Sequence, residues 1–370
     1  MVHHPLRLTL DGDALAANWR WLADRGGGAA CGAAVKADGY GLGAREVVDR
    51  LRGAGCRDFF VSTWAEAQVL MPWAGAEGAT LSVLHGVGPD DMEAALASPA
   101  RPVLNSAAQV TRWRQTGRSC DVMVDTGINR LGLTPEEATG GLLDGLAIET
   151  LMSHLACADE PDHPMNERQL AAFKQLKQEI RARRYSLANS AGICLAPKYG
   201  FDLTRPGLAL YGGVPMPGNT EQENALKPVV AIEAQVVQVR DVAGGASIGY
   251  GATYVPSAPM RIAILNLGYA DGYLRQLADV GHALAGGRLC PILGRISMDL
   301  MAVEVPQGGR LKRVNLGEGR EDATYEQAEA VDVREGDWLE LNFRLAELAG
   351  PLSQYELLTS LGSRFERRWT

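Results

Sequence analysis

The sequence predicts an α/β protein in which a (β/α)8 TIM-type barrel is followed by a mostly β C-terminal domain. From Leu6 to about Gly213, short apolar runs alternate with helical patterns in about eight strand–helix units, as in a parallel sheet covered by helices. After about Asn219 the pattern changes to strands separated by glycine- and proline-rich turns. A chain of 370 residues is long enough for two domains, which we place at residues 1–218 and 219–370.

The predicted elements follow one another as strand and helix through the barrel. A helix opens near Asp13, and a long amphipathic helix spans about Pro164 to Arg181. The predicted barrel strands share an apolar character and lie at residues 30–37, 58–62, 80–85, 101–105, 121–125, 148–154, 185–189 and 208–211. A loop at residues 215–219 separates the domains, and the second domain contributes strands at 229–239, 261–267 and 300–305.

The composition is that of a globular protein, with 46% hydrophobic and 22% charged residues. A net charge of −8 and a pI near 5.4 argue against a nucleic-acid partner or an anionic membrane surface. The six cysteines are scattered without a Cys-x-x-Cys pair, so neither a disulfide framework nor a metal site is predicted. No apolar run approaches the roughly 18 residues of a membrane span, and no signal peptide opens the chain. We therefore expect a cytoplasmic protein.

One stretch, residues 33–43, combines a buried-strand pattern with a lysine and a glycine-rich turn. Burial disfavours the charged form of Lys36, so we expect its pKa to fall, and a desolvated amine is the nucleophile that forms Schiff bases with carbonyl compounds. Gly39 and Gly41 would let backbone N–H groups approach an anion, and Tyr40 offers a hydroxyl. The alternative is an ordinary strand–turn–helix junction whose lysine reaches solvent.

The run VKADGYG at residues 35–41 resembles the motif of alanine racemases in which a lysine carries pyridoxal 5'-phosphate (PLP) and a tyrosine holds its phosphate. The resemblance implies PLP as the cofactor, bound through Lys36 and Tyr40. The family usually has Asn at the position of Asp38 and His at that of Leu42. Neither difference touches the lysine or the tyrosine.

Further segments match the family pattern, in the family's order, as far as the C-terminus. The resemblance implies that Arg130 reaches the cofactor's phenolic oxygen and the substrate carboxylate, and that Tyr250 joins Lys36 as the second catalytic residue. It assigns Met298 and Tyr269 to substrate binding. The cofactor-binding set that it implies is Lys36, Tyr40, His154, Asn189, Ser190, Arg205, Gly207, Leu208 and Tyr211.

The predicted barrel gives an expectation that is independent of the resemblance. Active-site residues of such a barrel lie at the C-terminal ends of its strands. Single residues also have plainer explanations: an arginine can belong to a surface ion pair, and His154 can be a hydrogen-bonded core histidine. Their joint order along the chain favours the functional interpretation. The segments that fall at strand ends, or just before the last predicted strand, are Lys36, Asp125–Gly127, His154, Asn189–Ser190 and Arg205–Gly207.

Racemisation needs an acid or a base on each face of a planar intermediate. We predict that Lys36 serves one face and Tyr250 the other. A tyrosine has an ordinary pKa of about 10, so it needs nearby positive charge to act as a base, and His154 and Arg205 are the candidates. The resemblance places Arg205 against the pyridine nitrogen. Its permanent charge there would favour simple proton transfer over further reactions of the carbanion such as elimination. In the family the tyrosine comes from the partner subunit, which implies a homodimer with shared sites.

Three further positions depart from the family pattern. Met123 stands where many relatives carry a lysine modified to a carbamate, so Arg130 must be held otherwise, by an anion or by Asn129. Ser186 replaces a histidine that some relatives place behind the pyridine-facing arginine. Ser363 replaces a tyrosine at the pocket mouth. The smaller side chain leaves more room there, so substrates larger than alanine are not excluded.

The primary prediction is a PLP-dependent isomerase that interconverts L- and D-alanine. One alternative is a broad-specificity or serine racemase of the same architecture. A second is a non-catalytic PLP-binding barrel, although such proteins usually lack a β domain. A third is an amino-acid decarboxylase, for which we find no acidic residues suited to a long basic substrate. Two cellular roles are compatible with the sequence: supply of D-alanine for peptidoglycan precursors, and D-amino-acid catabolism.

Overall fold

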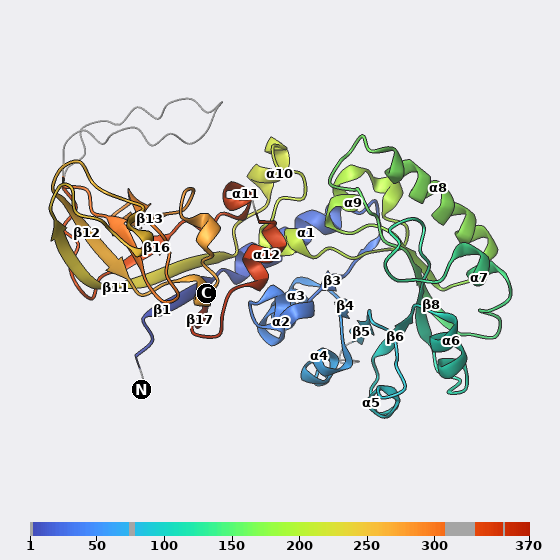
Figure 1. The fold of residues 1–370 in the computed structure, drawn as a ribbon. Coiled ribbons are helices and arrows are strands. Elements are labelled where there is room, and N and C mark those ends of the chain that lie inside the picture. Colours follow the sequence, from blue (N-terminus) through green and yellow to red (C-terminus); the bar gives the residue numbers. More distant parts are fainter. Residues whose placement is uncertain (1–2, 74–77, 308–329, 351) are drawn as a thin grey trace. The chain divides into compact units, whose positions relative to one another are not determined.

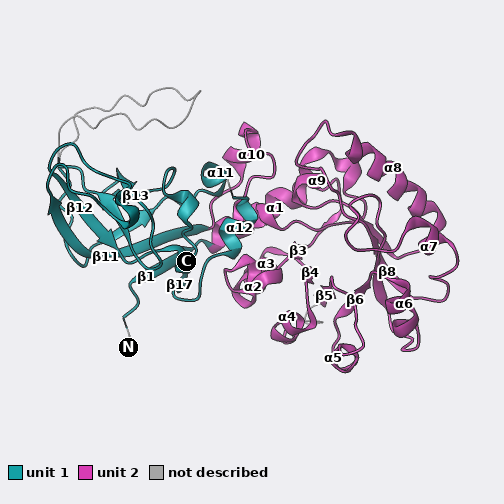
Figure 2. Cartoon of the chain, viewed as in Figure 1, with its two compact units in different colours: residues 1–11, 230–370 teal, residues 12–229 magenta. Residues whose placement is uncertain are grey.

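The chain divides into two compact units, shown in Figures 1 and 2. The computed structural model describes residues 3–73, 78–307, 330–350 and 352–370. Unit 2 consists of Gly12–Val229, and unit 1 combines Met1–Asp11 with Val230–Thr370. The sequence-based division at residue 218 keeps the N-terminal strand with the barrel, whereas the structure gives that strand to the β-rich unit. Among the described residues, no helix is both long and apolar enough to cross a membrane.

Unit 2 is a (β/α)8 barrel of parallel strands, as the sequence predicts. A short pair of strands, β2 (Ala30–Cys31) with β10 (Leu203–Thr204), adjoins the main sheet. Backbone hydrogen bonds from Asp202 N to Tyr185 O (3.0 Å) and from Arg205 N to Ala188 O (2.9 Å) tie β10 to the last strand of that sheet. The main sheet follows chain order: β3 (Ala33–Ala34), β4 (Asp58–Val61), β5 (Thr80–Val83), β6 (Arg101–Leu104), β7 (Cys120–Met123), β8 (Ile148–Met152) and β9 (Arg184–Ser186).

Helices follow the strands and lie outside the sheet (Figure 1). Four of these helices are N-capped by a local side chain whose oxygen accepts a backbone N–H of the first turn. The capping residues are Thr63, Ser106, Thr134 and Asn189. The helices are α1 (Gly12–Arg25), α3 (Ala44–Ala54), α4 (Trp64–Val69), α5 (Met92–Ala97), α6 (Ala107–Arg114), α7 (Pro135–Thr139), α8 (Pro164–Glu179), α9 (Ser190–Leu195) and α10 (Thr220–Ala225). The element labelled α2 (Lys36–Tyr40) in Figure 1 is a left-handed turn, described below.

One predicted strand is wrong. Residues Leu208–Tyr211 form a 3-10 turn, and the eighth strand of the barrel is β10. All side chains of this turn are buried, so a short apolar run of this kind cannot be distinguished from a strand by periodicity. Gly212, with φ of 84°, ends the turn in the left-handed region.

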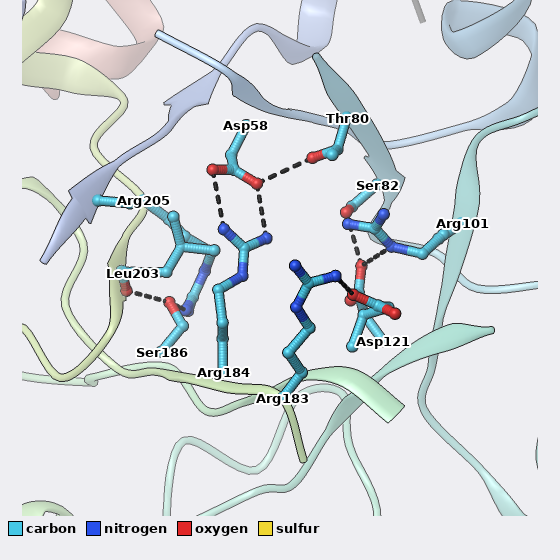
Figure 3. A network of polar contacts seen from close by, with 12 residues as sticks. Asp58, Thr80, Ser82, Arg101, Asp121, Arg183, Arg184, Ser186, Leu203 and Arg205 are labelled. Atoms are coloured by element: carbon cyan, nitrogen blue, oxygen red, sulfur yellow. Dashed lines mark hydrogen bonds and ion pairs between the residues drawn. The ribbon is translucent and has the colours of Figure 1, made fainter. Parts of the chain in front are cut away.

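Charged residues fill the barrel interior at the N-terminal ends of its strands, as Figure 3 shows. Arg184 donates to both carboxylate oxygens of Asp58, at 2.6 and 3.0 Å. Asp121 accepts the hydroxyl of Ser82 at 2.6 Å and lies 3.5 Å from Arg101. Both carboxylates are buried, so pairing with arginine offsets their loss of solvation. This network lies at the end of the barrel that carries stability rather than chemistry.

Unit 1 is mostly β, as predicted. Its longest described strand is β11 (Val230–Val242). The first half of β11 alternates buried and half-buried side chains, the pattern of a strand with one face on a core. Pairing of β11 with both β16 and β12 closes part of the sheet into a ring. Its described strands, in sheet order, are β12 (Met260–Leu265), β15 (Met301–Glu304), β14 (Arg288–Leu293), β13 (His282–Ala285), β16 (Trp338–Leu341), β11 (Val230–Val242), β1 (Leu6–Leu10) and β17 (Glu366–Trp369). Two short helices, α11 (Leu345–Leu348) and α12 (Gln354–Thr359), precede β17.

Candidate active site

Lys36 follows β3 at the C-terminal end of the barrel and begins an unusual left-handed turn. Ala37, Asp38, Gly39 and Tyr40 have φ of 51°, 51°, 63° and 57°. For residues with a Cβ this conformation costs about 1–2 kcal/mol each, so such a run persists only where its surroundings enforce it. Hydrogen bonds within the segment contribute, among them Gly41 N to Ala37 O at 2.8 Å. The turn fixes Lys36 and Tyr40 to one short piece of backbone.

The amine of Lys36 lies in a setting that favours its neutral form. Burial lowers the pKa of Lys36 most, the positive charge of Arg130 lowers it further, and Glu66 opposes both. This agrees with the sequence-based expectation of a falling lysine pKa. A neutral amine is the form that attacks a carbonyl carbon or accepts a proton.

Two buried tyrosines form the wall beside this turn. The rings of Tyr40 and Tyr211 stack with centroids 4.6 Å apart and planes 27° apart. The Tyr211 hydroxyl donates to Ala34 O at 2.9 Å, which ties the stack to β3. A Cβ at Gly207 would come within 2.2 Å of the Tyr40 hydroxyl, so the backbone can run this close only because residue 207 is glycine.

Ser190 joins the start of α9 to the backbone around Gly207. Its hydroxyl oxygen accepts N–H groups from Gly207 at 2.9 Å and from Ala209 at 3.3 Å. The side chain of Asn189 accepts the Gly192 N–H at 2.9 Å and so caps α9. The structure thus brings Tyr40, Ser190, Gly207 and Tyr211 together, while Asn189 acts on the helix itself. Leu208 follows Gly207 as the first residue of the 3-10 turn.

Arg205 is buried among neutral partners. Its guanidinium donates to the hydroxyl of Ser186 and to the carbonyl of Ser153. Burial lowers the pKa of Arg205 to about 10, and the charge of Asp121 works in the other direction. Arg205 therefore stays positively charged near neutral pH.

His154 lies in the same part of the barrel and is neutral. Burial lowers the pKa of His154 to about 3, with further contributions from the positive charges of Arg205, Arg130 and Lys36. Of the two residues predicted as sources of positive charge, only Arg205 carries one. The mutual coupling of these side chains also shows that they share one electrostatic environment.

The Arg130 loop is held by Asp125, which the sequence analysis placed at a strand end but did not assign to this role. Asp125 accepts backbone N–H groups from Gly127 (2.7 Å), Ile128 (2.9 Å) and Arg130 (3.1 Å). Met123, at the end of β7, is buried and offers no charge to the guanidinium. Asp125 therefore fixes the backbone of the loop and leaves the exposed Arg130 side chain to meet a ligand.

The remaining predicted residues lie in unit 1. Tyr250 opens a short 3-10 turn, η4 (Tyr250–Ala252), and is 73% exposed. It lines a cavity of about 420 Å³ together with Arg295, Ser297 and Leu300. Met298 is also exposed.

Tyr269 and Met298 belong to two segments joined by the backbone. Tyr269 N donates to Ser297 O, and Ala270 N donates to Met298 O, both at 3.0 Å. The guanidinium of Arg275 lies 4.7 Å from the Tyr269 ring centroid, a cation–π contact.

An ion pair between a fully buried aspartate and a half-exposed arginine supports these two segments, and the sequence analysis missed it. Asp271 is fully buried and accepts Gly268 N at 3.0 Å and Arg364 Nε at 2.6 Å. Arg364 also donates to Asp299 at 2.7 Å. A further missed residue is Glu66, whose signal was a Thr-x-x-Glu capping box directly after the strand at residues 58–62.

Fold and site together define a barrel protein with a buried lysine of lowered pKa near the cationic side chains of Arg130 and Arg205. A family model described as alanine racemase, N-terminal domain, matches residues 10–215, and one described as alanine racemase, C-terminal domain, matches residues 229–369. The chain therefore belongs to the alanine racemase family.

Relatives and solved structures agree with this assignment. An alanine racemase from Methylobacterium nodulans is 42% identical, over 99% of this chain and 96% of the relative. A catabolic alanine racemase from Mesorhizobium japonicum is 40% identical, over 98% of this chain and 92% of the relative. The crystal structure of alanine racemase from Bartonella henselae with covalently bound pyridoxal phosphate matches with a TM-score of 0.85 at 33% identity, covering 100% of both chains.

Proposed function

We propose that this protein is a PLP-dependent alanine racemase that interconverts L- and D-alanine, with Lys36 and Tyr250 as its two proton-transferring residues. The observation that carries the proposal is the left-handed turn after β3, which bears Lys36 at one end and Tyr40 at the other. It occurs in a chain that matches alanine racemases over nearly all of its length.

Two features of unit 2 fit PLP. Lys36, Arg130 and Arg205 surround a neutral His154, so the site favours a ligand that carries phosphate and phenolate charge. The glycine at 207 leaves open a cradle beside the Tyr40 hydroxyl that any side chain would fill. Both features suit a ring with a phosphate arm.

Each residue of the cluster then has an assigned part. Lys36 would carry PLP covalently, and the hydroxyls of Tyr40 and Ser190, with the backbone at Gly207 and Leu208, would hold its phosphate. Tyr211 braces Tyr40 through the ring stack, and Asn189 braces Ser190 by capping its helix. Arg205 would face the pyridine nitrogen, His154 would lie beside the ring, and Arg130 would bind the substrate carboxylate. When bound, PLP withdraws electrons from the attached amino acid and acidifies its α-hydrogen.

The proton is then exchanged by two residues of the chain. A lowered pKa lets Lys36 accept the proton at Nζ on one face of the substrate carbon. Tyr250 holds a proton at its phenol oxygen and delivers it to the other face. Of the two predicted sources of positive charge in the site, Arg205 is charged and His154 is neutral.

We also propose a homodimer in which Lys36 of one subunit and Tyr250 of its partner complete each site. Support comes from the exposure of Tyr250 and Met298, two apolar-bodied side chains on the surface of unit 1. A cytoplasmic location is proposed as well, because all six cysteines are free, as a reducing compartment would keep them.

One experiment tests the activity directly. The purified protein should show the yellow absorbance of lysine-bound PLP and should bring solvent deuterium into the α-position of L-alanine. L-serine serves as the comparison substrate, because exchange of similar speed would indicate a broad-specificity or serine racemase. Absence of colour after PLP addition would contradict every PLP-based function, and colour without exchange would indicate a non-catalytic PLP barrel.

A further inference from the structure

Beyond the contacts around its own helix start, Glu66 makes one extra contact to a different strand–helix unit. It is the third residue of α4, and its Oε2 accepts the N–H of the N-cap residue Thr63 at 3.3 Å, while the Thr63 hydroxyl accepts the Glu66 N–H at 3.2 Å. This reciprocal pair is a complete capping box. The same carboxylate also accepts Ser62 N at 2.6 Å and, through Oε1, Ala37 N at 2.8 Å.

The extra contact falls on the residue directly after Lys36. Ala37 begins the left-handed run, and the first N–H groups of a helical turn have no acceptor within the turn. Glu66 supplies that acceptor from a neighbouring strand–helix unit. A charged carboxylate forms stronger hydrogen bonds than a neutral acceptor, so the contact is well suited to hold strained backbone.

A second carboxylate holds the far side of the same turn. Asp38 Oδ1 accepts the N–H of Ala44, the first residue of α3, at 2.8 Å. The turn is thus fixed to α4 at its start and to α3 beyond its end. Glu66 differs from Asp38 in that its charge also acts on Lys36, whose pKa it raises against burial and Arg130.

We propose that Glu66 is a positioning residue for the cofactor lysine: its carboxylate clamps the left-handed turn through Ala37 N and so sets the relative placement of Lys36 and Tyr40. This inference rests on the proposed function, because the two residues must reach opposite ends of one PLP molecule. A glutamate that only capped α4 would matter for stability and not for the cofactor.

The test compares Glu66→Gln with Glu137→Gln. Glu137 forms the same capping box with Thr134 at the start of α7, without a contact to the lysine turn. Apoprotein of each variant is titrated with PLP. Glutamine cannot accept N–H groups on both sides, so Glu66→Gln should weaken PLP binding by about tenfold or more, whereas Glu137→Gln should bind like the wild type.

Two further readouts separate positioning from stability. The rate of PLP uptake follows neutral Lys36, so its pH midpoint should move to lower pH in Glu66→Gln, because a carboxylate that raises the lysine pKa is removed. Addition of Ala37→Gly to Glu66→Gln should recover part of the affinity, because glycine adopts positive φ without the Cβ penalty. The double variant also serves if Glu66→Gln alone does not fold.

The outcomes are distinct. If Glu66→Gln and the double variant bind PLP with wild-type affinity and unchanged pH midpoint, the positioning role is overturned. Equal losses in Glu66→Gln and Glu137→Gln would also overturn it, because helix capping would then explain both. Failure of the wild type itself to bind PLP would instead refute the proposed function.

Discussion

The guanidinium of Arg205 is held by the hydroxyl of Ser186, and not by a carboxylate, inside the barrel. The Ser186 hydroxyl in turn donates to Leu203 O at 2.5 Å, so its oxygen is turned toward the arginine. A neutral partner orients Arg205 without cancelling its charge. Ser186 thus orients the guanidinium of Arg205.

The charge of Arg205 leads to a prediction about side reactions. Arg205→Glu should increase transamination relative to racemisation, because a carboxylic acid could share a proton with the pyridine nitrogen and deepen the electron sink. Arg205→Lys is the matched control, since it keeps the charge and should keep the side reaction low. The measurement is the amount of pyridoxamine phosphate formed per racemisation event. An unchanged ratio in Arg205→Glu would count against the assigned role of Arg205.

The close approach of Gly207 to Tyr40 predicts a steric effect on cofactor binding. Gly207→Ala would place a methyl group 2.2 Å from the Tyr40 hydroxyl and should weaken PLP binding by about tenfold or more. Gly53→Ala is the control, because Gly53 lies in α3 and an added Cβ there meets nothing within 4 Å. Absorbance titration of the apoproteins measures both. Wild-type affinity in Gly207→Ala would show that the cradle does not hold the phosphate.

The Asp58–Arg184 pair predicts how stability depends on pH. Burial alone would raise the pKa of Asp58, but the hydrogen bond and charge of Arg184, with the hydroxyl of Thr80, bring it below its ordinary value. A lowered folded-state pKa contributes stability above the unfolded pKa of about 4, and this contribution is lost as pH falls through the folded value.

Asp58→Asn should therefore lower the melting temperature most near neutral pH, where breaking a buried pair costs about 3–5 kcal/mol. The difference from the wild type should narrow below about pH 4. Melting curves from pH 7 to pH 3 give the comparison. A difference that stays constant over this range would show that the charge of Asp58 is not what stabilises the barrel.

The Asp271–Arg364 pair predicts an effect on substrate selection. Arg364→Met removes the guanidinium from a fully buried carboxylate beside the Tyr269 and Met298 segments. Looser segments should raise KM for L-alanine and raise the kcat/KM ratio of L-serine to L-alanine. Arg368→Met is the control, because Arg368 pairs with Glu366 on the surface. Identical KM values and ratios in the two variants would contradict a supporting role for Arg364.

Much of the fold was readable from the sequence because it rests on local patterns. Mostly apolar runs such as Asp58–Val61 and Cys120–Met123, each with one aspartate, became buried parallel strands. The assignment of residues 208–211 to a strand failed because length and apolarity alone do not separate a strand from a buried turn. The N-terminal strand Leu6–Leu10 pairs with a strand more than two hundred residues away, Val230–Val242, and such long-range pairing leaves no local signal.

In the candidate site, too, residues in a local motif were predicted and residues that act through long-range contacts were not. Lys36 and Tyr40 stood out because lysine, tyrosine and glycines adjoin in one short run. Glu66 and Asp125 act through hydrogen bonds to backbone N–H groups, and Arg364 acts through ion pairs with Asp271 and Asp299. These contacts arise only on folding, so the local sequence did not reveal these roles. The left-handed conformation of Ala37 was also unexpected, because alanine rarely adopts positive φ.

The most direct test of the two-residue mechanism is the exchange behaviour of Tyr250→Phe. The substitution removes one hydroxyl and should leave the absorbance of bound PLP intact, because Lys36 is unchanged. Solvent deuterium is followed into the α-position of L-alanine and of D-alanine that is recovered without inversion. We predict that exchange slows at least about a hundredfold for one enantiomer and much less for the enantiomer served by Lys36. Equal slowing for both would contradict the assignment of Lys36 and Tyr250 to opposite faces.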